Sequence, residues 1–145
     1  MIPAFQADGA LPPGLHDATW EEFFRRFGTN EHRRSLLTGL KAALDSLRAA
    51  GCQTVYVDGS FVSSEDFPKD FDGCWDVVGV DPTKVDPVLL TFDPGRATQK
   101  AKYQGEMFPS NAKANPQGET FLDFFQSDRD GNPRGMIVLD LRRLP

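Results

Sequence analysis

Long apolar segments and clustered cysteines are both missing from this sequence. No apolar run approaches the roughly 20 residues of a membrane-spanning helix, and the first residues lack the basic and apolar regions of a signal peptide. Cys52 and Cys74 are isolated and have no metal-site spacing. We therefore expect no membrane partner, reduced and buried thiols rather than a disulfide, and a cytoplasmic protein.

Positive charge is also in deficit. The chain has 16 lysines and arginines against 21 acidic residues, a formal net charge of -5, which argues against a general nucleic-acid coat protein. The same charge balance argues against DNA as a partner, but it does not exclude a nucleotide or polynucleotide substrate. The charge is uneven, because the segment 96–113 is basic while residues 65–76 are acidic.

The length and composition of the chain are typical of one folded domain. Its 145 residues, 39% hydrophobic and 26% charged, are enough for a single sizeable core. Twelve phenylalanines indicate aromatic-rich packing between layers. We expect a single α/β (α+β) domain over residues 1–145, with helices first and a small mixed or antiparallel sheet after them.

Two helices are predicted near the start. Residues 1–18 contain prolines and glycines without periodicity, and we expect an extended segment there. Thr19 and Glu22 form a capping box that begins a helix ending at Gly28. A longer helix is expected from Thr29-Asn30 to Ala50, with Gly51 as its stop.

Two polar residues of this region have a structural and a functional interpretation. Arg33 lies off the apolar stripe of the long helix, which favours a solvated position, although an arginine at a helix start can also bind phosphate. His16 is expected to satisfy a local hydrogen bond, with a role at a site as the alternative.

The second half of the chain reads as strands joined by short helices and turns. We expect a helix or turn from Ser60 to Phe67 and a helix over 98–107. Residues 108–118 have the composition of a loop, and 128–134 of a hairpin turn. The predicted strands are 54–57, 69–80, 119–126 and 136–141.

The stretch 54–76 has the strongest chemical signal. The strand ends at Gly59-Ser60, where a small residue allows a tight turn that can bring N–H groups close to a phosphate. Asp70 and Asp72 follow, two residues apart, so in an extended strand they share one face. Two adjacent carboxylates repel unless a cation lies between them, and Mg²⁺ prefers oxygen ligands.

Gly59-Ser60 followed by Asp70-x-Asp72 resembles the signature of the DNA polymerase β-like nucleotidyltransferase superfamily. The resemblance is to its minimal members, which include antitoxins and small adenylyltransferases. Leu-Pro-Pro-Gly-Leu-His at 11–16 and Asp-Gly-Ser-Phe-Val at 58–62 are similar to a family of small bacterial and phage proteins.

The resemblance implies a nucleotidyltransferase-like fold and a site for NTP with Mg²⁺ or Mn²⁺. Asp70 and Asp72 would hold the metals, and Gly59 and Ser60 would bind the β- or γ-phosphate. The superfamily uses a third carboxylate from a later strand, for which Asp123 is chosen because residues 121, 123 and 125 alternate on one face.

The roles of four other residues have alternatives. Asp76 and Asp128 compete with Asp123 for the place of the third carboxylate. Lys100 and Lys102 would bind triphosphate or the backbone of an acceptor, with a solvated face as the alternative.

Three functions follow as hypotheses. The first is metal-dependent transfer of a nucleoside monophosphate from NTP to a protein or RNA acceptor. The second is a catalytically inactive binding protein of the same fold, such as an antitoxin or phage-defence component acting on a toxin-like partner. This hypothesis is favoured where the pattern departs from the superfamily, because Gly73-Cys74-Trp75-Asp76 follows the acidic pair. The third is a metal-dependent phosphodiesterase.

Overall fold

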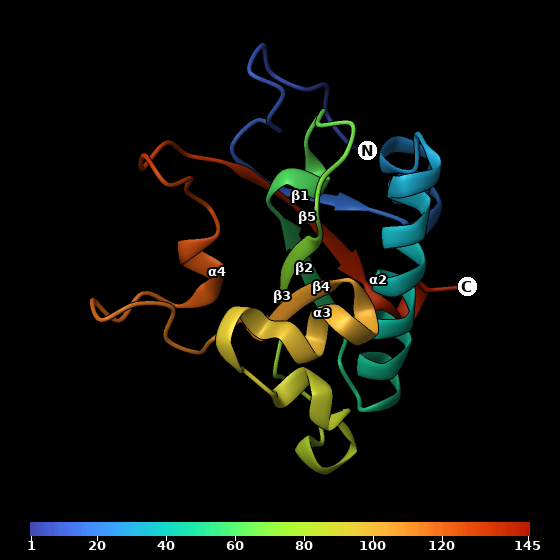
Figure 1. The fold of residues 1–145 in the computed structure, drawn as a ribbon, viewed down its shortest axis with the longest axis vertical. Helices are drawn as coiled ribbons and strands as arrows, with labels where there is room; N and C mark the ends of the chain where they lie inside the picture. The colour runs from blue at the N-terminus through green and yellow to red at the C-terminus, as the bar shows by residue number, and fades with distance from the viewer.

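A five-stranded mixed sheet lies at the centre of the computed structural model, which describes residues 1–145 (Figure 1). The strand order is β1-β5-β2-β3-β4. The inner pairs β5–β2 and β2–β3 are antiparallel, and the outer pairs β1–β5 and β3–β4 are parallel. In chain order the helices and strands are β1 Gly14–Ala18, α1 Trp20–Phe27, α2 Glu31–Ala49, β2 Thr54–Asp58, β3 Phe71–Trp75, α3 Ala97–Tyr103, β4 Gly105–Pro109, α4 Phe121–Phe124 and β5 Gly135–Asp140.

The helices α1 and α2 begin where the sequence predicts. The Thr19 hydroxyl accepts a hydrogen bond from the Glu22 N–H, and the Glu22 carboxylate accepts one from the Thr19 N–H, which completes the capping box. Asn30 caps α2 by accepting a hydrogen bond from the Arg33 N–H at 2.8 Å. These local signals fix both helix starts.

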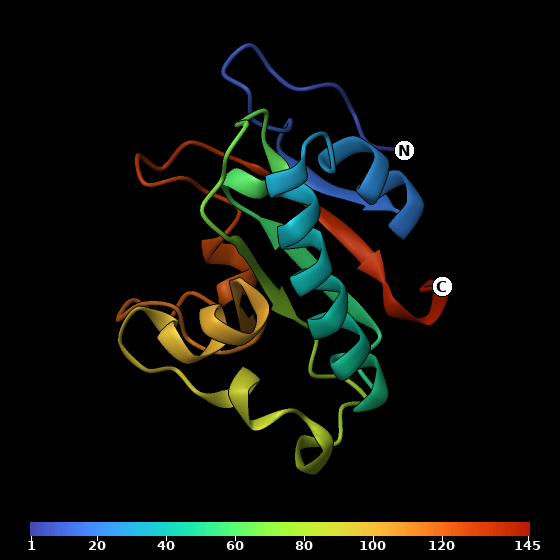
Figure 2. The same cartoon turned by 45° about the vertical axis from the view of Figure 1, so that its right-hand side comes forward.

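The two faces of the sheet have different coverings. Helices α1, α2 and α3 lie against one face, and a cluster of 25 buried hydrophobic residues fills the space between them and the sheet. The connection from β4 to β5, which contains α4, lies on the other side (Figures 1 and 2). Gly39 lets α2 approach α3 closely, because a Cβ there would overlap the Tyr103 carbonyl. None of the helices is long and apolar enough to span a membrane.

The structure corrects three of the predicted elements. The segment 14–18, expected to be part of an extended N-terminal segment outside the sheet, is strand β1 and pairs with β5. The helix expected over 98–107 ends at Tyr103, because Gln104 adopts a positive φ of 68° and the chain continues as β4. The strand expected over 119–126 is wrong: Thr120 caps the short helix α4 by accepting from the Asp123 N–H.

The other predicted elements are confirmed with different lengths. The strand expected over 69–80 is limited to Phe71–Trp75. The strand expected over 136–141 is β5, shifted by one residue. A three-residue 3-10 helix, Ser60–Val62, stands where a helix or turn was expected after Gly59.

Candidate functional site

Three carboxylates lie side by side on the neighbouring strands β2, β3 and β4. In the register of the strands Asp58 of β2 is opposite Asp72 of β3, and Asp72 is opposite Glu106 of β4. Their neighbours Val57, Phe71 and Met107 belong to the core under the helices. Because side chains alternate along a strand, the three carboxylates point to the face opposite the helices.

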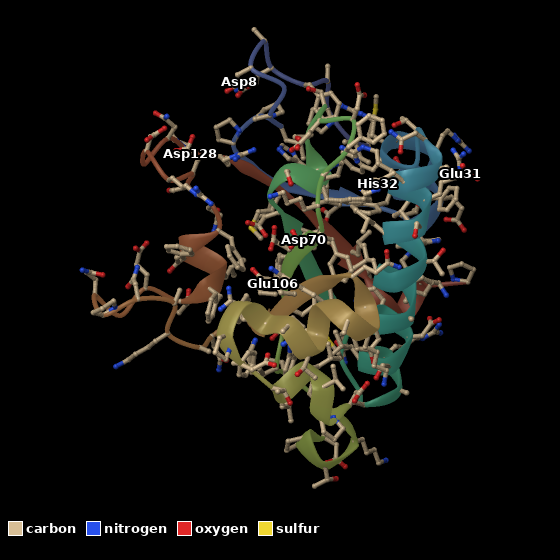
Figure 3. All side chains as sticks on the ribbon, viewed as in Figure 1. Asp8, Glu31, His32, Asp70, Glu106 and Asp128 are labelled. Carbon is tan, nitrogen blue, oxygen red and sulfur yellow. The ribbon has the colours of Figure 1, made fainter.

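Asp70 extends this row, and two cations from the α3 side balance it. The Lys100 Nζ lies 3.2 Å from the Asp70 carboxylate and 3.9 Å from that of Glu106. The Arg96 Nε donates to Glu106 Oε2 at 2.7 Å. Asp70 and Glu106 lie near one another at the centre of Figure 3, close to where β3 and β4 meet α3. The site is therefore an acidic row with a basic edge, four carboxylates against two cations.

Burial makes the inner part of the row electrostatically unfavourable. Asp58 is only 8% exposed, and its Oδ1 has no hydrogen-bond partner. Burial, with Glu106 nearby, raises the pKa of Asp58 to about 8, although Arg134 acts in the opposite direction. Burial also raises the pKa of Asp72, and the neighbouring Asp58, Glu106 and Asp70 add to the shift. A cation placed among these oxygens would stabilise their ionised forms.

Gly59 brings the turn after β2 against this row. Its φ of 78° and ψ of -161° belong to a region that is essentially restricted to glycine. A Cβ at this position would lie 2.8 Å from Asp72 Oδ2. The predicted need for a small residue here is confirmed, and the reason is both conformational and steric.

Arg33 holds the loop that follows. It is 2% exposed, so the interpretation of Arg33 as a solvated residue is wrong. Its guanidinium donates to four backbone carbonyls at 2.5–3.2 Å, those of Phe27, Phe61, Ser63 and Glu65. Because carbonyls consume its donors, Arg33 fixes the shape of the loop and does not face a phosphate. His16, as expected, makes a local hydrogen bond, from Nε2 to the Pro12 carbonyl.

The candidates for the third carboxylate lie away from the row. Asp123 is exposed on α4, not on a strand, so the alternation that suggested it does not exist. Asp76 follows β3 at the end opposite to Asp70 and accepts from the Val78 N–H. Asp128 organises an outer turn by accepting from the N–H groups of Asp130 and Asn132, and Figure 3 shows it far from Asp70 and Glu106.

Of the two lysines selected from the sequence, only Lys100 contacts the row. Lys102 pairs with Asp86 at 2.5 Å and lies over the Tyr103 ring. Since the two lysines are two residues apart on a helix, they point in different directions. The basic edge consists of Lys100 and Arg96.

Sequence reasoning missed Asp58 and Glu106. Asp58 was visible as the residue between a β-branched strand and Gly59-Ser60, a place where a buried carboxylate is unusual. Glu106 was hidden because 98–107 reads as one helix. The positive φ of Gln104, a non-glycine residue, left no signal in the sequence.

The donor set fits a divalent cation in chemistry. Carboxylate oxygens are the ligands that Mg²⁺ and Mn²⁺ prefer, and the unpartnered Asp58 Oδ1 is a buried acceptor that lacks a donor. As the side chains stand, however, no three acidic, histidine or cysteine residues form a ready metal site. Lys100 and Arg96 occupy the acceptor positions of Asp70 and Glu106, so a metal would have to compete with them.

Comparisons with known proteins place the chain in a family. Searches of curated proteins and of solved structures found no match. One family model, described as a family of unknown function, matches residues 3–140. The match covers nearly the whole chain, including the sheet, the acidic row and the Gly59-Ser60 turn, so the protein belongs to the DUF6932 family.

Proposed function

We propose that this protein is a metal-dependent nucleotidyltransferase of minimal, DNA polymerase β-like type, which transfers a nucleoside monophosphate from NTP to a protein or RNA acceptor. The observation that carries the proposal is the row of Asp58, Asp72 and Glu106, with Asp70 beside it and the Gly59-Ser60 turn against it. The row supplies the buried carboxylates, and the turn supplies a close backbone approach.

Glu106 takes the place that Asp123 was expected to fill. It lies on the strand next to the Asp70-x-Asp72 pair, in register with Asp72. Asp70, Asp72 and Glu106 would hold Mg²⁺ or Mn²⁺, which when bound polarises the α-phosphate and lowers the pKa of the attacking hydroxyl. Lys100, released from Asp70, would then be free to bind the triphosphate.

The remaining residues would position the phosphates and balance the charge of the cation. The backbone of Gly59 and Ser60 would bind the β- or γ-phosphate, while Arg33 keeps the following loop in place through its carbonyl contacts. Asp58, at the β2 end of the row, would add negative charge once a bound cation stabilises its ionised form. The free, buried Cys52 and Cys74 fit a reducing, cytoplasmic location.

The experiment is nucleotide transfer with matched variants. Purified protein is incubated with each α-labelled NTP, Mg²⁺ or Mn²⁺, and a cell extract. We expect label on an acceptor with wild type and with Asp123→Asn, and none with Glu106→Gln or the Asp70→Asn/Asp72→Asn double variant. Thermal unfolding checks that each variant is folded. Loss of transfer in Asp123→Asn with retention in Glu106→Gln would contradict the assignment.

A second candidate is a binding protein that uses the same site without chemistry. It is favoured by the ion pairs of Lys100 with Asp70 and of Arg96 with Glu106, since these partly neutralise the row without a metal. This candidate, an antitoxin or phage-defence component, predicts a toxin-like partner that co-purifies equally with wild type and the double variant. Release of a nucleotide from a phosphodiester, with no incorporation, would instead indicate a phosphodiesterase.

A further inference from the structure

A small aromatic cavity adjoins the acidic row on the same face of the sheet. It has a volume of about 280 Å³ and is lined by Phe92, Phe108, Pro109, Ala112, Lys113 and Phe121. Three separate parts of the chain form it: the segment before α3, the end of β4, and the connection that carries α4. Phe92 is 48% exposed at its edge, so its ring is accessible to a ligand.

The rings present flat and nearly parallel surfaces. Phe108 and Phe121 stack with centroids 4.1 Å apart and planes 7° apart. Phe92 lies against Phe108 with centroids 5.6 Å apart and planes 13° apart. Phe108 and Phe121 leave no room for a ligand between them, so the ring of Phe92 is the surface on which a flat ligand can stack.

The cavity lies at a defined distance from the carboxylates. Glu106 and Phe108 are two residues apart on β4 and point to the same face, so their Cα atoms are roughly 6.6 Å apart along the strand. Arg96 links the two places, because its guanidinium donates to Glu106 and lies 5.8 Å from the Phe108 ring centroid. A ligand with a flat ring one sugar away from a phosphate fits this spacing.

The charges beside the cavity and the backbone conformation of Arg96 also favour a ligand that has both a flat ring and anionic groups. Arg96 has a left-handed backbone, φ 52° and ψ 42°, which is unfavourable for a residue other than glycine. This conformation, together with its bond to Glu106, places a cation between the cavity and the row. Lys113 adds a second cation at the lining. Two cations beside an aromatic cavity suit an aromatic ligand that carries anionic groups.

We infer that this cavity binds the base of the nucleotide whose phosphates lie at the acidic row, by stacking on the accessible ring of Phe92. The inference rests on the proposed function and adds the base subsite to it. Recognition comes mainly from stacking, so every base is accepted and purines bind more tightly than pyrimidines.

The test separates the base from the phosphates. Calorimetric titration with Mg²⁺ compares ATP and CTP with inorganic tripolyphosphate, which has no base. Wild type is compared with Phe92→Ala, with Phe92→Trp, which retains a stacking surface, and with Phe124→Ala. Phe124 is a matched control because it is similarly exposed, at 43%, but does not line the cavity.

We expect wild type to bind ATP more tightly than CTP and both more tightly than tripolyphosphate. Phe92→Ala should weaken ATP binding by about 5- to 150-fold, the range for loss of one base–aromatic stack, and leave tripolyphosphate binding unchanged. Phe92→Trp should restore ATP binding, and Phe124→Ala should change neither ligand.

Two results overturn the inference while the proposed function stands. They are equal affinity of wild type for ATP and tripolyphosphate, and an unchanged or equal response of both ligands to Phe92→Ala. If wild type binds neither ligand, the proposed function fails, and the base subsite fails with it.

Discussion

The two faces of the sheet differ in the side chains that they bury: one is apolar, and the other has a row of carboxyl groups. The face under α1, α2 and α3 is closed by apolar side chains such as Leu44 and Val57, which are fully buried. The opposite face has Asp58, Asp72 and Glu106 in one row, with the Asp58 Oδ1 unpartnered. The first face favours folding, whereas the second gathers buried carboxyl groups whose ionisation costs stability. The nucleotide and metal site that we propose would make use of this second arrangement.

Arg33 belongs to the stabilising side of this comparison and should have the largest effect. Arg33→Met leaves four backbone carbonyls without their donor, each at a cost of roughly 1–3 kcal/mol. We expect a loss of at least about 4 kcal/mol in the free energy of unfolding, measured by urea denaturation. Arg34→Met is the control, since Arg34 donates only to the Gly28 carbonyl at an exposed position. Equal losses in the two variants would contradict the role given to Arg33.

Gly59 lies against the acidic row, and its substitution should cause the next largest loss of stability. Gly59→Ala combines an unfavourable φ with a contact to Asp72 Oδ2, for an expected loss of about 2–4 kcal/mol. Gly95→Ala also has a positive φ, 65°, but open space around its Cβ, so it should lose only about 1–2 kcal/mol. Thermal and urea unfolding measure both. A Gly95→Ala variant as unstable as Gly59→Ala would show that crowding at the row is unimportant.

The cost of burying Asp58 on the acidic face should appear as a pH dependence of the free energy of unfolding. Its folded-state pKa of about 8 lies above the unfolded value near 4, so the folded state binds the proton more tightly. The free energy of unfolding therefore falls as pH rises from about 4 to about 8.

Asp58→Asn should remove this part of the pH dependence. At pH 8 we expect the variant to be more stable than wild type by about 1–3 kcal/mol, and the difference to shrink toward pH 5. Urea denaturation at several pH values measures it, with Asp123→Asn as an exposed control that should behave as wild type. Mg²⁺ should narrow the gap at pH 8 by stabilising wild type. Parallel pH profiles for wild type and Asp58→Asn would rule out an ionisation cost at Asp58.

The smallest expected effect is on nucleotide binding, and it distinguishes Lys100 from Lys102. Lys100→Met removes the cation at the edge of the row and should weaken Mg²⁺-dependent nucleotide binding roughly fivefold. Lys102→Met should leave binding unchanged, because Lys102 pairs with Asp86 away from the row. Titration calorimetry decides between them. Equal weakening in both variants would indicate a diffuse electrostatic effect rather than a contact.

Local signals in the sequence were sufficient for much of the fold. The capping box at Thr19 and the cap at Asn30 determine the starts of α1 and α2 through contacts within four residues. The β-branched run before Gly59 identified β2, and the motif placed Asp70 and Asp72 near the turn. Strand β1 was missed because its pairing partner, β5, lies more than 100 residues away in the chain. A five-residue segment next to prolines has no periodicity that reveals such a partner.

The two helices, the central strands and the acidic pair beside Gly59-Ser60 have local signals, and these elements could be predicted from the sequence. Tertiary packing is needed to show which carboxylates meet and which cations balance them. Asp58 and Glu106 join Asp72 through strand register, and register depends on the pairing of distant segments rather than on neighbouring residues. The burial of Arg33 and the meeting of Phe92, Phe108 and Phe121 have the same cause, because contacts between distant segments form only when the whole chain packs.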